Sequence, residues 1–166
     1  MPAIERYTGV LYGALDHRTL PASSSRRLAD QVFIASGAFG LVAPMDPIPD
    51  YKLKMGAGLP GVGKLSTSWR PHLDAALAAE VQGRTVWDLL PNEHAAAWSG
   101  SGGAATEISV RFVDEVERGG RRERVAVAHW NKLLKGALVR HVLATQIDEP
   151  GVFMMFEESI GELTEN

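Results

Sequence analysis

Residues 129–143 carry the most informative hydrophobic pattern, because their leucine, valine and alanine residues fall on nearly every side of a 3.6-residue wheel. Such a pattern predicts one long helix that the rest of the protein surrounds. Lys132, Gly136 and Arg140 recur at every fourth position and share one stripe of that helix, with Lys135 beside it. Cations on an enclosed helix need a carboxylate, an anionic ligand or a water-filled cleft, because an unpaired buried charge is too costly. The alternative is that both lysines extend to solvent and Arg140 pairs with a structural acid.

The remaining hydrophobic patterns predict strands and helices that alternate along the sequence. Short apolar runs predict buried strands at 31–35 and 85–90, and an alternating pattern predicts a half-exposed strand at 107–113. Gly119-Gly120 predicts a turn that pairs this last strand with 124–127 as an antiparallel hairpin. Helices are expected at 6–15, 69–81 and 93–98, and an amphipathic segment at 152–160. Strands interleaved with helices, plus one hairpin, indicate an α/β (α+β mixed) fold with a central mixed sheet.

Length and composition narrow the class of protein. A chain of 166 residues fits one domain over residues 1–166 that buries enough surface to need no disulfide or metal. Cysteine is absent, which excludes disulfides and thiol nucleophiles and fits a reducing compartment. The sequence shows no signal-peptide pattern and no apolar run of membrane-spanning length, so a cytoplasmic protein without a membrane partner is expected.

The charge is unevenly distributed. The formal net charge of −3 argues against a basic nucleic-acid-binding module as a whole. Basic residues nevertheless cluster between Arg118 and Arg140, whereas the segment 148–165 is acidic. The cluster indicates a local positive patch, although a solvent-exposed hairpin tip explains the Arg121-Arg122 pair equally well.

Two loops carry candidate chemistry. The turn that begins with Ser36-Gly37 follows a buried strand, so its backbone N–H groups could bind an anion, or it could be a plain tight turn. The loop 44–56 is rich in proline and contains Asp46, Tyr51 and Lys52, which could perform acid–base chemistry if they converge. The same three residues could also belong to a surface loop tied down by Asp–Lys contacts.

Other familiar motifs are excluded or absent. Residues 58–64 match the spacing of a nucleotide-binding P-loop, but Leu65 stands where a hydroxyl is needed and no strand precedes the loop. The five histidines show no metal-ligand spacing, so neither a metal site nor a cofactor is indicated. His141 shares a helix side with leucines and is predicted to be a core residue.

Several runs between about residue 6 and residue 142 together resemble one family. They are Arg6-Tyr7-Thr8-Gly9-Val10-Leu11-Tyr12, Ser36-Gly37-Ala38-Phe39-Gly40-Leu41-Val42, Pro44-Met45-Asp46 with Tyr51-Lys52-Leu53, and His129-Trp130-Asn131-Lys132 with Lys135-Gly136 and Val139-Arg140. In these runs the chain resembles the YaaA peroxide-stress family. The resemblance implies a cytosolic single-domain protein with a cationic cleft that binds DNA and a role in limiting iron-driven oxidative damage. It implies no established reaction.

The sequence departs from the family pattern at two places. Pro91-Asn92-Glu93-His94 keeps the family's glutamate but lacks its serine and tyrosine. The chain also begins beyond the position of the family's first strand, so the domain is expected to lack the family's N-terminal segment. A missing strand leaves a shorter sheet or an open edge that a partner or a second copy could cover, which makes a homodimer one expectation.

Three functional hypotheses follow. The first is a stress protein whose cationic cleft binds DNA, and the second is a diverged enzyme or binder of an anionic small molecule in the same cleft. The third is an interaction subunit that pairs through an open sheet edge. The candidate ligand-binding residues are Ser36, Gly37, Asn131, Lys132, Lys135, Gly136 and Arg140, and the candidate catalytic residues are Lys132, Tyr51, Asp46 and Lys52.

Overall fold

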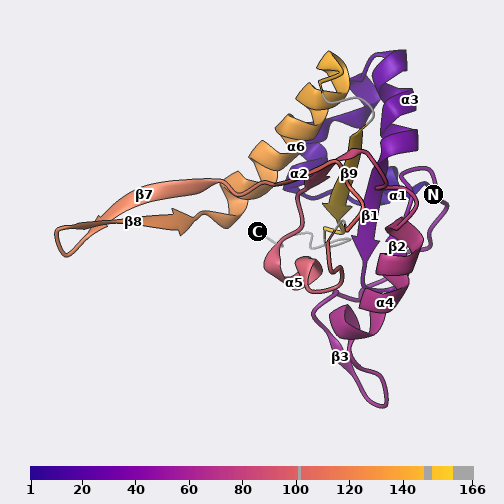
Figure 1. Cartoon of the computed structure of the whole chain (residues 1–166), viewed down its shortest axis with the longest axis horizontal. Helices are drawn as coiled ribbons and strands as arrows, with labels where there is room; N and C mark the ends of the chain where they lie inside the picture. The colour runs from indigo at the N-terminus through magenta and orange to yellow at the C-terminus, as the bar shows by residue number, and fades with distance from the viewer. Residues whose placement is uncertain (101, 148–150, 159–166) are drawn as a thin grey trace.

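The structure is a computed structural model that describes residues 1–100, 102–147 and 151–158. Its centre is a five-stranded sheet in which only the edge strand β2 is antiparallel to its neighbour (Figure 1). The strands follow the spatial order β2 (Gly40–Val42), β1 (Val32–Ser36), β9 (Gly151–Phe156), β5 (Thr85–Asp88) and β6 (Thr106–Ser109). The predicted mixed α/β fold is therefore confirmed.

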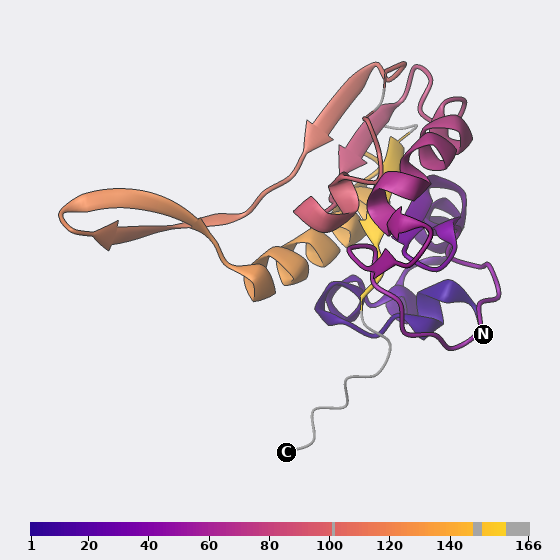
Figure 2. The ribbon, with the colours of Figure 1, turned by 90° about the horizontal axis from the view of Figure 1, so that it is seen from below.

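The helices surround this sheet. They are α1 (Ala3–Arg6), α2 (Val10–Leu15), the 3₁₀ turn η1 (His17–Thr19), α3 (Ala22–Gln31), α4 (Leu65–Leu77), α5 (Asn92–Ala95) and α6 (Ala128–Thr145). Helix α6 packs along α2 and contacts α3, whereas α4 packs near β2 (Figures 1 and 2). None of the helices in the described part of the chain is both long and apolar enough to cross a membrane.

The central strand β9 corrects one prediction. Residues 152–158 belong to a segment expected to be amphipathic, and residues 159–160 of that segment lie outside the described part of the chain. In the structure, β9 lies between β1 and β5 and pairs with both in parallel. All six of its residues are buried. A strand covered on both faces needs a continuous apolar run, and Val-Phe-Met-Met-Phe is such a run.

Helix α6 is confirmed as one long helix, but the rest of the protein does not surround it. Its buried residues are Lys135, Gly136, Val139, Val142 and Leu143. Trp130 is 54% exposed, and His141, predicted to lie in the core, is also exposed. The predicted core position of His141 is therefore wrong, because the helix buries one face and leaves the other to solvent.

The predicted hairpin forms with a different first strand. Residues 107–109 belong to β6, which pairs with β5 in the central sheet. The hairpin consists of β7 (Val113–Arg118) and β8 (Arg121–Ala126), and it projects from the body as a two-stranded ribbon (Figures 1 and 2). Gly119 and Gly120 both have positive φ, as a two-residue hairpin turn requires, so the position of the turn is confirmed. A further, shorter hairpin pairs β3 (Gly58–Leu59) with β4 (Gly63–Lys64).

Candidate functional site

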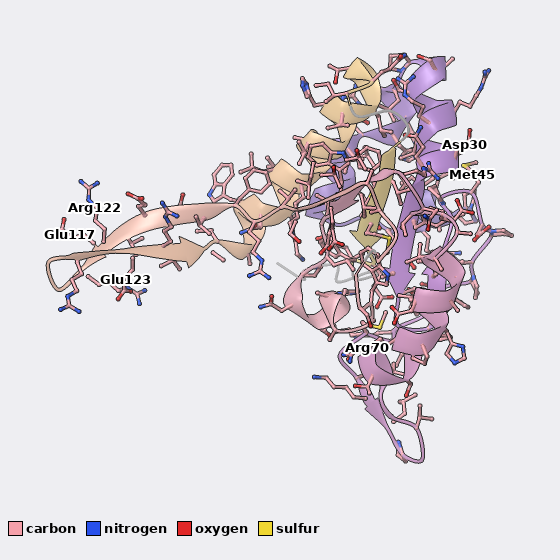
Figure 3. The ribbon with its side chains drawn as sticks, viewed as in Figure 1. Asp30, Met45, Arg70, Glu117, Arg122 and Glu123 are labelled. Carbon is pink, nitrogen blue, oxygen red and sulfur yellow. The ribbon has the colours of Figure 1, made fainter. Side chains whose placement is uncertain are left out.

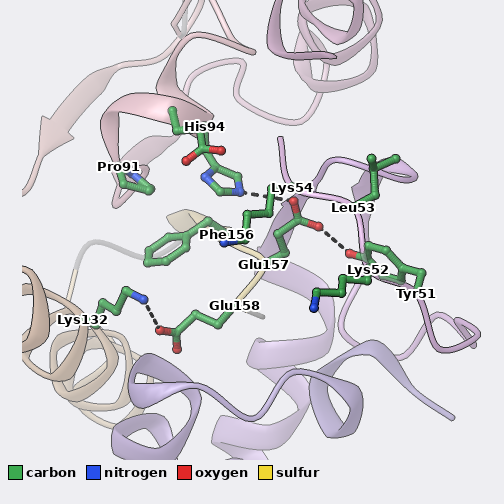
Figure 4. A pocket seen from close by; sticks show the side chains of 11 residues that line it. Tyr51, Lys52, Leu53, Lys54, Pro91, His94, Lys132, Phe156, Glu157 and Glu158 are labelled. Carbon is green, nitrogen blue, oxygen red and sulfur yellow. Dashed lines mark hydrogen bonds and ion pairs between the residues drawn. The ribbon is translucent and has the colours of Figure 1, made fainter. Parts of the chain in front are cut away.

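A pocket of about 260 Å³ lies where β1, β9 and β5 end, the edge at which open α/β sheets bind ligands. The loop that follows β2, the segment that follows β5, the residues that follow β9 and one lysine of α6 line it (Figure 4). The lining residues are Tyr51, Lys52, Leu53, Lys54, Pro91, Glu93, His94, Lys132, Phe156, Glu157 and Glu158.

Glu157 occupies the position that the glycine turn was expected to offer to an anion. Its Oε1 accepts hydrogen bonds from the backbone N–H groups of Gly37 (2.8 Å) and Met55 (3.1 Å), and its Oε2 accepts one from the hydroxyl of Tyr51. A Cβ atom on Gly37 would lie 2.7 Å from the backbone of Lys54 and Met55, so only glycine allows this approach. The turn therefore does bind a carboxylate, and that carboxylate belongs to the same chain.

Tyr51 connects Glu157 to a buried hydroxyl network. Its hydroxyl lies 2.9 Å from Ser36 Oγ and 2.7 Å from the hydroxyl of Tyr7. Burial raises the pKa of Tyr51 far above its usual value, and the hydrogen bond to Glu157 raises it further. Tyr51 therefore remains protonated at physiological pH and acts as a hydrogen-bond donor to the carboxylate.

Glu158 forms the other side of the pocket. Its Oε2 accepts the backbone N–H of Leu11 at 2.8 Å, and its Oε1 lies 2.9 Å from Nζ of Lys132. The carboxylate side chain is almost fully buried, whereas the lysine side chain is 42% exposed. A Cβ atom on Gly9 would lie 2.1 Å from this carboxyl group, which explains the glycine there. Lys132 thus meets a structural acid and still reaches the pocket surface.

His94 is the least satisfied polar group of the pocket. The residue is 7% exposed, and neither ring nitrogen has a hydrogen-bond partner among the described residues. Its Nε2 lies 3.5 Å from Oε1 of Glu157, beyond a good hydrogen bond, and its ring centroid lies 5.6 Å from that of Phe156. Buried polar atoms in native proteins normally have partners, so two free nitrogens at a pocket wall require an explanation.

The predicted stripe of α6 divides among three different contacts. Lys132 reaches Glu158 at the pocket, whereas Gly136 faces Leu11, so that a Cβ atom there would lie 2.1 Å from the Leu11 carbonyl oxygen. Arg140 donates to the carbonyl oxygens of Leu15, Asp16 and Thr19, at and beyond the end of α2. Because α2 has only six residues, the stripe of α6 from Lys132 to Arg140 passes the whole of it in about two turns.

Two further candidates on α6 also have structural partners. Lys135 is buried and donates to the carbonyl oxygen of Leu89 at 2.7 Å, and burial lowers its pKa. Asn131 forms hydrogen bonds with both the N–H and the carbonyl oxygen of Phe112, which fixes the base of the β7–β8 ribbon. Neither Lys135 nor Asn131 is among the residues that line the pocket.

Of the predicted acid–base residues, the structure brings Tyr51 and Lys52 into the pocket but not Asp46. The Oδ2 of Asp46 accepts the backbone N–H of Ala43 at 2.7 Å and closes a turn. Within the described residues, no group of three or more His, Cys, Asp or Glu side chains is arranged to hold a metal ion.

Sequence reasoning missed His94, Glu157 and Glu158 as site residues. The two glutamates follow the buried run 151–156 directly, and two acids after a buried parallel strand are a recognisable signal for a site at the sheet edge. That signal depends on assigning β9 correctly. His94 gave no signal by spacing, because its neighbours in the pocket come from distant parts of the sequence.

The sequence comparisons identify the family. The family model described as "Peroxide stress protein YaaA" matches residues 1–161. This chain belongs to the YaaA peroxide-stress protein family. Similar proteins include a UPF0246 protein of Streptomyces coelicolor, 41% identical over 145 residues that cover 87% of this chain and 54% of the relative. A UPF0246 protein of Corynebacterium glutamicum is 38% identical, covering 84% and 54% of the two chains, and one of Cereibacter sphaeroides is 30% identical, covering 90% and 59%.

The chain spans little more than half the length of these curated relatives. The predicted kinship with the YaaA family, which is described as a family of peroxide stress proteins, is confirmed.

Proposed function

We propose that this YaaA-family chain acts in the peroxide-stress response by binding duplex DNA, and that the β7–β8 ribbon is its main contact surface. The family membership supports the link to stress. The single observation that carries the DNA contact is the projecting ribbon with its arginine-bearing tip, seen with its side chains in Figure 3. A two-stranded antiparallel ribbon has dimensions that the major groove of B-form DNA admits.

The two faces of the ribbon each carry two arginines and two acids, but the arginines are paired differently on each face. Residues paired across the strands share one face, so Glu115 and Arg124 lie opposite each other, as do Glu117 and Arg122. Glu115 lies 3.7 Å from both Arg122 and Arg124, so this face largely neutralises itself. An exposed pair of this kind contributes little to stability.

The other face carries unpaired arginine at the tip. Arg118 and Arg121 are opposite each other in the register, next to the turn, and neither forms an ion pair within the described residues. Both are exposed, and the strands expose nearly all of their residues. An isolated two-stranded hairpin is only marginally stable in water, so this ribbon gains most by lying against a partner. Two free guanidinium groups at its end suit a phosphate backbone.

The cationic helix contributes less to this surface than its sequence suggests. Lys135 and Arg140 donate to backbone carbonyl oxygens and are not available to phosphates. Lys132 is partly exposed and lines the pocket, and Lys52 and Lys54 are exposed beside it. The proposed surface therefore combines the ribbon tip with the lysines at the pocket mouth.

The test measures binding of a fluorescently labelled duplex by anisotropy over a range of salt concentrations. We expect duplex binding at low salt. The logarithm of the association constant should fall linearly with the logarithm of the salt concentration. The double variant Arg118→Ala/Arg121→Ala should reduce the slope by about 2, since each lost phosphate contact reduces it by about 1.

The matched control is Arg18→Ala/Arg26→Ala, which removes the same charge from exposed positions on the helical side. It should change the slope much less than the ribbon variant does. Absence of duplex binding at low salt, or equal behaviour of the two double variants, would contradict the proposal.

A further inference from the structure

All three tyrosines of the chain lie in one cluster beside the pocket. The ring centroids of Tyr7 and Tyr12 are 5.4 Å apart, and those of Tyr7 and Tyr51 are 6.5 Å apart. Tyr7 and Tyr12 are buried, whereas Tyr51 is half-buried and lines the pocket. A phenol can give up one electron, so three adjacent phenols that reach a pocket through one of them form a candidate redox cluster.

The hydrogen bonds of this cluster run in one direction. Tyr51 donates the single proton of its hydroxyl to Oε2 of Glu157 (Figure 4). A phenol has only one proton to donate, so the oxygen of Tyr51 must accept from the hydroxyl of Tyr7 at 2.7 Å and from that of Ser36 at 2.9 Å. The ordered path for a proton is therefore from Tyr7 to Tyr51 and from Tyr51 to Glu157.

The carboxylate at the end of this path is what oxidation of a phenol requires. A phenol that loses only an electron becomes a strongly acidic cation, and an unpaired charge away from water is costly. Burial raises the pKa of Tyr51, and the hydrogen bond to Glu157 raises it further, so the phenol does not ionise first. Glu157 can instead accept the proton as the electron leaves, because the two groups are already hydrogen-bonded.

Tyr12 belongs to the cluster but lacks such a base. Its hydroxyl donates to the backbone carbonyl oxygen of Phe156 at 2.6 Å. A carbonyl oxygen is a far weaker base than a carboxylate and cannot hold the proton that oxidation releases. Tyr12 is therefore a neighbour of the same type that stands outside the proton path.

We propose that the cluster is a one-electron redox site, at which Tyr51 reduces a small oxygen-centred radical that enters the pocket. The radical gains one electron from Tyr51 and becomes an anion, while the O–H bond of Tyr51 breaks and its proton binds Oε2 of Glu157. The products are a phenoxyl radical on Tyr51, a neutral carboxyl group and the reduced oxidant. Tyr7 then passes an electron and its hydroxyl proton to the oxygen of Tyr51, which moves the radical to a residue that is only 2% exposed.

Flash photolysis of ruthenium tris-bipyridine with persulfate supplies a one-electron oxidant to the intact chain and tests the proposal. Transient absorption and freeze-quench electron paramagnetic resonance distinguish a phenoxyl radical from an indole radical, which Trp130 offers as the exposed rival site. We expect a phenoxyl radical in the parent chain. It should form more slowly in D₂O than in H₂O, because a proton moves together with the electron.

Two variants remove parts of the proton path. Glu157→Gln removes the base but keeps an oxygen that can accept the backbone N–H groups of Gly37 and Met55. It should slow phenoxyl formation at least about 100-fold, since a positioned proton acceptor contributes about that much or more. Tyr51→Phe should abolish the phenoxyl signal although two tyrosines remain, because neither of them is hydrogen-bonded to a carboxylate.

Tyr12→Phe is the matched control, since it removes a buried phenol of the same cluster from outside the proton path. It should leave the yield and the rate of phenoxyl formation unchanged. Tyr7→Phe should still form the radical, but ascorbate should quench it faster, because it then stays on half-buried Tyr51. A thermal melt checks that each variant is folded, and the comparison of H₂O with D₂O needs no variant.

The proposal is overturned if the parent chain yields only an indole radical, or if phenoxyl formation is equally fast in H₂O and D₂O. It is also overturned if Tyr51→Phe keeps the phenoxyl signal, or if Tyr12→Phe loses it to the same extent. Equal quenching of the parent and Tyr7→Phe would refute the transfer to Tyr7. The ribbon variant Arg118→Ala/Arg121→Ala should form the radical normally, so failure of the redox site and failure of DNA binding are distinguished.

Discussion

Replacing Gly136 with alanine should destabilise the protein strongly, although alanine is the better helix former. At this position the backbones of α2 and α6 approach so closely that an added Cβ atom would lie 2.1 Å from the carbonyl oxygen of Leu11 and 3.0 Å from Cβ of Ala14. An ordinary contact between a carbon and a carbonyl oxygen is about 3.3 Å. One helix must therefore shift by roughly 1.2 Å, the difference between these two distances.

Such a shift cannot remain local, because α2 is tied into the core on several sides. Leu11 and Leu15 are fully buried, the N–H of Leu11 binds Glu158, and the hydroxyl of Tyr12 donates to the carbonyl oxygen of Phe156 at 2.6 Å. Overpacking of this kind costs about 1–3 kcal/mol, and a weakened buried hydrogen bond adds about 1 kcal/mol. Alanine regains about 1 kcal/mol of helix propensity. We expect a net loss of about 1–3 kcal/mol in unfolding free energy, or roughly 2–12 °C in Tm for a domain of this size.

Thermal and urea denaturation followed by circular dichroism measures the effect. Gly13→Ala is the matched control, since Gly13 lies on α2 and a Cβ atom there meets nothing within 4 Å. That variant should gain up to about 1 kcal/mol from propensity alone. If Gly136→Ala were as stable as the parent chain, or shifted in the same direction as the control, the close approach of α2 and α6 would be refuted.

Two further changes test the polar interior. Tyr51→Phe removes the hydroxyl shared by Ser36, Tyr7 and Glu157 and should lower the unfolding free energy in urea by about 2 kcal/mol; an unchanged midpoint would contradict the network. Burial raises the pKa of Asp88 in the folded state, so folding favours its protonated form. The resulting contribution to stability is fully present below the unfolded-state pKa near 3.8 and is lost as pH rises through the folded-state pKa. Asp88→Asn should therefore raise Tm relative to the parent at neutral pH, with the gain shrinking toward pH 3, and a gain that grew on acidification would refute the assignment.

The parts of the fold that the sequence predicts correctly are those determined by nearby residues. The long helix α6, the positions of strands β1 and β5, and the turn at Gly119-Gly120 all follow from periodicity or turn chemistry within a few positions. Gly136 of α6 is also a sound signal, since a glycine inside a helix indicates a close approach to the helix backbone. What approaches is the carbonyl of Leu11 in α2, not a ligand.

The parts that the sequence misplaces depend on distant segments. The predicted strand 107–113 runs from β6 to the first residue of β7, and its first part pairs with β5 in the central sheet, which no nearby residue indicates. The sequence predicts an anionic ligand or a structural acid as the partner of Arg140, because nothing local shows that the end of α2 offers it three carbonyl oxygens. Glu157 directly follows β9, and β9 is the central strand only because it pairs with the distant strands β1 and β5.

The position of β9 has a consequence for how the protein is made. All other strands of the sheet precede residues 151–156 in the sequence, yet β1 and β5 are joined only through this strand. During synthesis the two halves of the sheet must wait, with apolar surface uncovered, until β9 leaves the ribosome. The same event delivers Glu157 to the turn at Gly37, so sheet closure and assembly of the pocket are a single late step.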